Sequence, residues 1–244
     1  MTYLFQGQPL NAYLQEYGIP FEHMSLSING DHRELCPYDR SLENRDQIAS
    51  LINIYEDKKD VCKMNRYFGF ALSHNWFNRG KKRKTSELKK HMSNYVRNIA
   101  KAHSAQVMWT TFKDCKDSLK SAGYTRTRNL TEEEKALDKE AKKALKERLE
   151  CFVPSTCRAT NDYADRDVLM YIMNYYPPEY LVRHYEERTT PEGKAISINR
   201  DLWALSNFLQ WVFRSAVRNG RTVDLYLPSA RMRDIYEKWV RFEL

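Results

Sequence analysis

The 244-residue sequence lacks the signatures by which a chain usually holds a nucleotide or a metal on its own. Glycine occurs only eight times, and neither a G-x-x-x-x-G-K-[ST] phosphate loop nor a D-E-x-[DH] acidic box is present. The five cysteines form no C-x-x-C pair, and none of the six histidines pairs with a nearby Cys or Ser in a known pattern. We therefore predict no metal site. A carboxylate cluster assembled in space, as in a metal-dependent nuclease, is a less favoured alternative.

Long apolar runs are also missing. No stretch of about 18 apolar residues occurs, which argues against a membrane span, and the first residues lack a basic segment followed by a continuous apolar one. Charged residues make up 30% and hydrophobic residues 42% of the chain, as in ordinary soluble domains. We expect a cytoplasmic protein with reduced thiols and no membrane partner.

Positive charge is abundant, with 40 Lys and Arg residues and a formal net charge of +8. Such a surplus favours polyanions, although it also serves solubility alone. The densest basic run covers residues 79–84, and we expect it in a turn before a helix at 86–102. It is open to interpretation as a nuclear-import tag, a phosphate-contacting loop or a solvated turn. Its candidate nucleic-acid contacts are Lys81, Lys82, Arg83 and Lys84.

Residues 1–100 are expected to form a mainly helical region. Turn signals punctuate the first part, including Asn29-Gly30-Asp31. Apolar residues at helical spacing predict a helix over 46–55, and an aromatic-rich segment at 67–77 is interpreted as a packing helix.

Residues 101–244 are expected to form an α/β domain. The β-branched and aromatic run at 106–112 predicts a strand, and a helix over 113–122 should end at Gly123. Thr131 and Glu134 match a capping box at the start of a charged helix over 131–150, within a helical insertion at 129–150. A short strand at 152–154 then leads into a polar loop. Further along we predict a helix over 165–175 and a polar hairpin or loop over 189–198.

The last part of the chain carries the most specific pattern. Apolar spacing predicts a buried-face helix over 201–218, on which Gln210, Arg214 and Arg218 recur every four residues along another side. A turn at 219–220, an apolar strand at 223–227 and a closing helix capped by Ser229 should follow. On that closing helix, Arg231 and Arg233 are expected either to touch phosphate or to face water. The Gln210, Arg214 and Arg218 group suits phosphoryl transfer, but it also fits a solvated helix face.

Three blocks together resemble the second RecA-like lobe of superfamily-two helicases of the DEAD/DEAH type, and of phage- or plasmid-type helicase-like proteins. Residues 107–124 (VMWTTFKDCKDSLKSAGY) are similar to motif IV, residues 152–167 (FVPSTCRATNDYADRD) to motif V, and residues 209–228 (LQWVFRSAVRNGRTVDLYLP) to motif VI. The resemblance covers residues 100–242.

This resemblance implies an α/β fold with a RecA2-like parallel sheet flanked by helices, preceded by the mainly helical region. It implies that Arg214 or Arg218 acts as an arginine finger beside Gln210. It also implies a nucleic-acid track to which Lys113 would add, with the motif residues Thr110, Thr111, Arg158, Thr160 and Asn161. Because the phosphate loop is absent, the chain should hold no cofactor, and ATP with magnesium would come only with a partner lobe.

Two functions follow as alternatives. The first is a helicase-related protein or subunit that binds single- or double-stranded DNA in replication or processing, and that is at most part of an ATP-dependent enzyme. The second is a protein-interaction module, an inhibitor or adaptor that docks on a host or viral protein.

Overall fold

The structure, a computed structural model, describes residues 4–56, 69–79, 81–157 and 162–244, with the backbone alone at 81–84. Its centre is a four-stranded parallel sheet with strand order β3-β6-β5-β4. The strands are β3 (Ile52–Ile54), β4 (Val107–Thr110), β5 (Val168–Tyr171) and β6 (Val223–Tyr226). A parallel bridge from Trp109 to Phe152 extends the sheet beyond β4. The predicted α/β class with a parallel sheet flanked by helices is confirmed.

Both faces of the sheet are covered, and successive buried residues of a strand enter different cores. Met108, Leu169 and Leu225 pack into one core, and their neighbours Trp109, Met170 and Tyr226 pack into the other. Every residue of β4 and β5 is buried, as expected for parallel strands between two helical layers.

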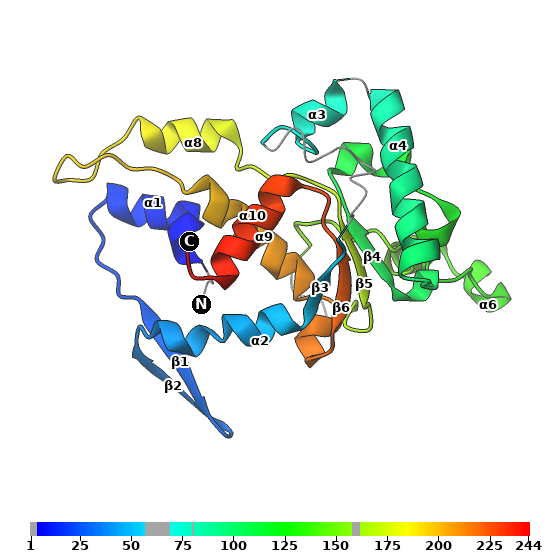
Figure 1. Cartoon of the computed structure of the whole chain (residues 1–244), viewed down its shortest axis with the longest axis horizontal. Helices are drawn as coiled ribbons and strands as arrows, with labels where there is room; N and C mark the ends of the chain where they lie inside the picture. The colour runs from blue at the N-terminus through cyan, green and yellow to red at the C-terminus, as the bar shows by residue number, and fades with distance from the viewer. Residues whose placement is uncertain (1–3, 57–68, 80, 158–161) are drawn as a thin grey trace.

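The two helical layers come from different parts of the chain. One face is covered by α2 (Arg45–Ser50), α9 (Arg200–Val212) and α10 (Ala230–Val240). The other face is covered by α3 (His74–Asn78), α4 (Lys81–Asn94), the π-helix η4 (Tyr95–Ile99) and α5 (Lys116–Leu119). Figure 1 shows α9 and α10 on one side of the sheet and α4 on the other.

The remaining elements lie around this centre. At the start of the chain are η1 (Phe5–Gly7), α1 (Pro9–Glu16), an antiparallel hairpin of β1 (Met24–Asn29) and β2 (His32–Pro37), and η2 (Arg40–Glu43). Short helices follow later: η5 (Ser104–Gln106), η6 (Lys113–Cys115), η7 (Ala122–Tyr124), α6 (Glu132–Lys135), α7 (Lys139–Arg148), α8 (Glu179–Glu186) and η8 (Ala216–Asn219). The hairpin turns at Gly30, whose φ of 60° is a conformation that glycine adopts without strain. Residues 1–100 thus contain a hairpin and the sheet strand β3 as well as helices.

The predicted helix over 165–175 is wrong, because residues 168–171 form β5 in the middle of the sheet. The segment is apolar on both sides, and a strand buried on both faces lacks the alternation that separates strand from helix. The predicted helix over 46–55 is also too long. It ends at Ser50, and β3 follows it.

The predicted helix over 201–218 is wrong in its last third. α9 ends at Val212, and Arg218 lies in the separate 3-10 helix η8. Ser215 Oγ donates to Val212 O at 2.6 Å, and Ala216 N donates to Arg166 O at 2.8 Å. The latter bond ties the chain to the loop before β5, so the backbone leaves the helical path.

Other boundaries also differ from the predictions. The helix expected over 113–122 is η6 followed by the four-residue α5, and Gly123 lies inside η7 without a positive φ. The charged helix expected over 131–150 is divided into α6 and α7. Residues 81–84 begin α4 instead of forming a turn. The capping box of Thr131 and Glu134 and the cap of α10 by Ser229 are both confirmed.

Candidate functional site

The parallel sheet has two chemically different edges, and the predicted site residues are divided between them. All four carboxyl ends meet at one edge, while α9 runs back across the sheet toward the amino edge. There, Asn219 Nδ2 donates to Ala164 O at 3.3 Å and Arg221 Nη2 donates to Asp165 O at 3.1 Å, in the loop before β5. The segment that carries Arg214 and Arg218 therefore lies at the amino edge.

The three residues predicted for phosphoryl transfer do not form one face. Gln210 Nε2 donates to the buried Ser206 Oγ at 3.0 Å, which also accepts from Gln8 Nε2 at 2.9 Å. Arg214 is buried, with 7% of its surface exposed, whereas Arg218 is exposed. Because α9 ends before Arg214, the spacing by four does not place Arg214 and Arg218 on one face of a single helix.

The predicted nucleic-acid residues of the motif IV block lie at the opposite, carboxyl edge. Thr110 and Thr111 are buried at the end of β4, and Thr111 Oγ1 donates to Ile172 O at 2.9 Å. Lys113 is exposed just beyond them. Arg158, Thr160 and Asn161 lie outside the described residues, as do the side chains of Lys81, Lys82, Arg83 and Lys84.

The basic run opens a longer basic segment that consists of α4, η4 and the two residues after them. Residues 81–101 contain eight Lys or Arg residues and a single acid, Glu87, so they carry +7 of the formal net charge of +8. Leu88 and Met92 face the core, whereas Lys90, Arg97 and Lys101 are exposed. The rest of the chain is close to neutral, so nearly all of the net positive charge belongs to this one segment.

In open parallel sheets, ligands bind outside the carboxyl ends of the strands. At this edge, beyond β4, His74 and Asp114 meet, with Nε2 and Oδ2 3.2 Å apart and both side chains about half exposed. His74 follows Leu72, which is fully buried at a φ of 61°, a strained conformation for a branched residue.

Arg231, on α10, packs against the residues that follow the carboxyl end of β5. Its guanidinium donates to Asn174 Oδ1 at 2.9 Å and to Asp201 Oδ1 at 2.5 Å, and it stacks 4.0 Å from the ring centre of Tyr176. Asn174 Nδ2 in turn donates to Gly69 O at 3.3 Å, which also accepts from Tyr176 Oη at 2.8 Å. Both terminal nitrogens of Arg231 bind protein oxygens, and the side chain is buried, so this arginine shapes the edge and does not face water or an open phosphate site.

Arg233 has the same kind of role at the carboxyl ends of β3 and β6. Its Nε donates to Leu227 O at 2.6 Å, Nη2 donates to Tyr55 O at 2.9 Å, and Nη1 lies 3.3 Å from Glu56 Oε2. The side chain thus joins the carboxyl ends of two strands that are far apart in the sequence. Both arginines were expected to touch phosphate or to face water, and both instead bind protein oxygens.

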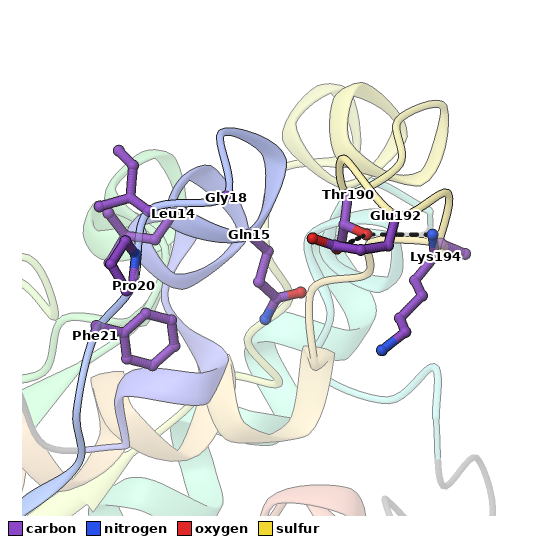
Figure 2. Close-up of a pocket in the computed structure, with 10 residues that line it drawn as sticks. Leu14, Gln15, Gly18, Pro20, Phe21, Thr190, Glu192 and Lys194 are labelled. Atoms are coloured by element: carbon purple, nitrogen blue, oxygen red, sulfur yellow. Dashed lines mark hydrogen bonds between the residues drawn. The ribbon is translucent and has the colours of Figure 1, made fainter.

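Two of the cavities on the described surface have volumes in the range of small-molecule sites. One, of about 450 Å³, lies between the end of α1 and the loop at 190–195. Figure 2 shows Pro20 and Phe21 on one side of it and Thr190, Glu192 and Lys194 on the other. None of the predicted site residues lines it.

The second cavity, of about 350 Å³, lies beside the edge strand β3, against the face covered by η4. It is lined by Asn53, Ile54, Tyr55, Glu56, Tyr95, Ile99, Ala100 and Asp224. Asp224 is exposed, and Asn53 Nδ2 donates to its Oδ1 at 3.4 Å. Burial, together with the nearby Asp224 carboxylate, raises the pKa of Tyr95, which keeps the phenol protonated. Pattern reasoning missed this cavity because its walls come from distant parts of the sequence.

Within the described ranges, no group of three His, Cys, Asp or Glu side chains is placed to hold a metal ion. The helices described there are also too short or too polar to cross a membrane.

A parallel sheet with helices on both faces defines a Rossmann-like α/β domain. The chain belongs to the family of the YonV C-terminal Rossmann-like domain, whose family model matches residues 46–240. It is similar to the SPbeta prophage-derived protein YonV of Bacillus subtilis (strain 168), with 31% identity over 98% of this chain and 51% of that protein. The chain thus spans about half the length of this curated relative. No solved structure matches it.

Proposed function

We propose that this Rossmann-like domain binds nucleic acid through the basic segment at residues 81–101. The observation that carries the proposal is the concentration of charge, since this one segment holds +7 of the formal +8. A helix of this kind can lie along a phosphate backbone and release its counterions. Lys113, exposed beyond β4, would extend the contact toward the carboxyl edge.

Backbone contacts of this type position a nucleic acid without reading its sequence. The test is fluorescence anisotropy with labelled single-stranded DNA, double-stranded DNA and RNA across a salt series. Tight binding at low salt supports the proposal if the logarithm of the binding constant falls steeply with the logarithm of the salt concentration. Absence of binding at low salt for all three probes contradicts it.

A narrower proposal makes the domain the second lobe of a helicase motor that completes the ATP site of another chain through Arg214 or Arg218. It rests on the resemblance of the three motif blocks. It requires those arginines to act from the amino edge of the sheet, on a nucleotide that a partner lobe holds there. In this form Arg214→Ala and Arg218→Ala lower ATP hydrolysis by the assembled motor and leave DNA binding by this chain unchanged. DNA-stimulated ATP hydrolysis by the chain alone would argue against it.

The alternative of a protein-interaction module has one specific observation in its favour. The β1–β2 hairpin exposes apolar side chains on one face, with Ile28 at 65% and Leu35 at 58% exposure. If nucleic acid does not bind, protein docking becomes the favoured function, and this hairpin is the first surface to alter. DNA-independent capture of one protein in stoichiometric amounts would then be the expected behaviour.

A further inference from the structure

The cavity beside β3 combines an uncompensated carboxylate with a buried hydroxyl. Asp224 points from β6 to the same side of the sheet as Tyr226, under η4, and within the described ranges no Lys or Arg lies in ion-pair distance of it. Its side-chain neighbour is the Asn53 amide at 3.4 Å, a long hydrogen bond.

Tyr95 supplies the second group. It is 98% buried, it lines the same cavity, and its hydroxyl has no hydrogen-bond partner among the described residues. Buried hydroxyls are normally paired, because an unpaired one loses its bonds to water without replacement. A ligand acceptor in the cavity would satisfy it.

The backbone that presents Tyr95 is itself unusual. Residues 95–99 form a π-helix, closed by Ala100 N donating to Tyr95 O at 2.8 Å, and Lys101 follows with a φ of 49°. Single π turns inside α-helices cost stability and are frequent at functional sites. This one forms the cavity wall and continues directly from the basic helix α4.

From this juxtaposition we propose that the cavity binds a guanine base of a single-stranded nucleic acid whose phosphates lie on the basic segment. This deepens the proposed function and rests on it. The Watson–Crick edge of guanine carries two adjacent N–H donors beside a carbonyl oxygen. Asp224 accepts the two donors, and the Tyr95 hydroxyl donates to the carbonyl.

The other bases do not offer this set. Adenine and cytosine each place one amino donor beside a ring acceptor, which a carboxylate repels, and uracil or thymine places its one donor between two carbonyls. Unpaired bases are commonly read on this edge against aromatic side chains, and here Tyr55, half-buried, stands at the cavity wall. The volume of about 350 Å³ is within the range of small-molecule sites.

A guanidinium group from a protein partner also has paired donors. The surroundings favour the base, because the adjacent basic segment repels a cation and attracts the phosphate that accompanies a nucleotide. A peptide arginine is therefore the competing ligand in the experiment.

The experiment compares the intact chain with Asp224→Asn and Tyr95→Phe. The control is Asp31→Asn, which makes the same charge change in the exposed turn of the β1–β2 hairpin. The probes are oligothymidines of about 15 nucleotides, with and without guanines at their centre, together with free guanosine, adenosine and N-acetyl-arginine amide in saturation-transfer NMR. We expect the guanine oligonucleotide to bind roughly tenfold more tightly, the range of one paired base contact.

In Asp224→Asn this preference should disappear while affinity for plain oligothymidine stays at the level of the Asp31→Asn control. In Tyr95→Phe, which keeps the ring, the preference should fall several-fold. Equal binding of both oligonucleotides, with no guanosine signal, overturns the guanine site and leaves the proposed function standing. Signal from arginine amide and none from guanosine also overturns it. If the intact chain binds no DNA but gives a guanosine signal that is absent in Asp224→Asn, the proposed function is contradicted and the pocket assignment stands.

Discussion

Arg231 Nη1 donates to Asn174 Oδ1 at 2.9 Å, and both side chains are buried where β5 ends. The same guanidinium reaches Tyr175 O at 3.0 Å and Asp201 Oδ1 at 2.5 Å. One side chain on α10 therefore links the end of β5 to the beginning of α9. Its loss would leave several buried polar groups unpaired at once.

We predict that Arg231→Ala lowers the free energy of unfolding by about 3 kcal/mol, the typical cost of breaking a buried charged network. Urea unfolding followed by circular dichroism measures it. Arg241→Ala at the end of the same helix is the control, because its pairs with Glu237 and Glu243 are half exposed and should contribute less than about 1 kcal/mol. Equal effects of the two variants would show that the network does not stabilise the carboxyl edge.

Charge reversal in the basic run provides a second prediction. Lys82→Glu with Arg83→Glu should weaken DNA binding and flatten its salt dependence, because each lost phosphate contact removes roughly 0.7–0.9 from the slope. Anisotropy across a salt series measures both quantities. Unchanged affinity would remove this run from the interface.

Neutralisation further along α4 tests whether the contact follows the helix. Lys89→Gln with Lys90→Gln should weaken binding of all sequences alike and lower the salt slope by between one and two. The matched control is Lys143→Gln with Lys146→Gln, which removes two exposed charges from α7. A control that weakens binding equally would mean that net charge, and not this helix, governs affinity.

The α6 cap should respond to pH in a defined direction. A hydrogen bond from Arg128 and one from the Thr131 backbone lower the pKa of Glu134 from 4.5 to about 2. A carboxyl with a lowered folded-state pKa stabilises the fold above its unfolded pKa, and that contribution is lost as pH falls from about 4.5 toward 2. NMR titration of the side-chain carboxyl should show the low pKa, and Arg128→Gln should raise it toward the ordinary value. A pKa that does not move in this variant would exclude Arg128 as its main cause.

Thiol reactivity gives a fifth prediction. Burial raises the pKa of Cys151 to about 12, so at about pH 8 its thiolate is negligible and its sulfur is also inaccessible. An aromatic disulfide reagent should modify the partly exposed Cys36 and Cys157 in the native protein and Cys151 only after denaturation. Peptide mass mapping identifies the modified residues. Rapid native labelling of Cys151 would show that the core around Phe152 opens.

The elements that the sequence predicts well are those with local signals. β4 and β6 have β-branched and aromatic runs between turns, and Ser229 marks the beginning of α10. The sequence predicts a helix in place of β5, because apolar and polar residues do not alternate along a strand that is buried on both faces. The sequence does not predict the end of α9, because a contact with a distant part of the chain accompanies it. Ala216 N donates to Arg166 O in the loop before β5.

The candidate site was harder to predict for the same reason. Asp224 and Tyr95 come together only through the pairing of β3 with β6 and the packing of η4 above them. Neither residue lies in a motif, and a single carboxylate on a strand has no distinctive spacing. The basic segment, by contrast, was visible as a run at 79–84, although its continuation along α4 depended on the helix that the structure shows.

The strand order has a consequence for how this protein reaches its native state. Among the described strands of the sheet, β6 is synthesised last, yet it pairs with β3 on one side and β5 on the other. Until β6 is made, β3 lacks its partner strand in the described sheet, and apolar residues that the sheet buries stay exposed. Such long-range pairing slows folding and leaves nascent chains open to aggregation. We therefore expect the growing chain to depend on chaperones until β6 emerges.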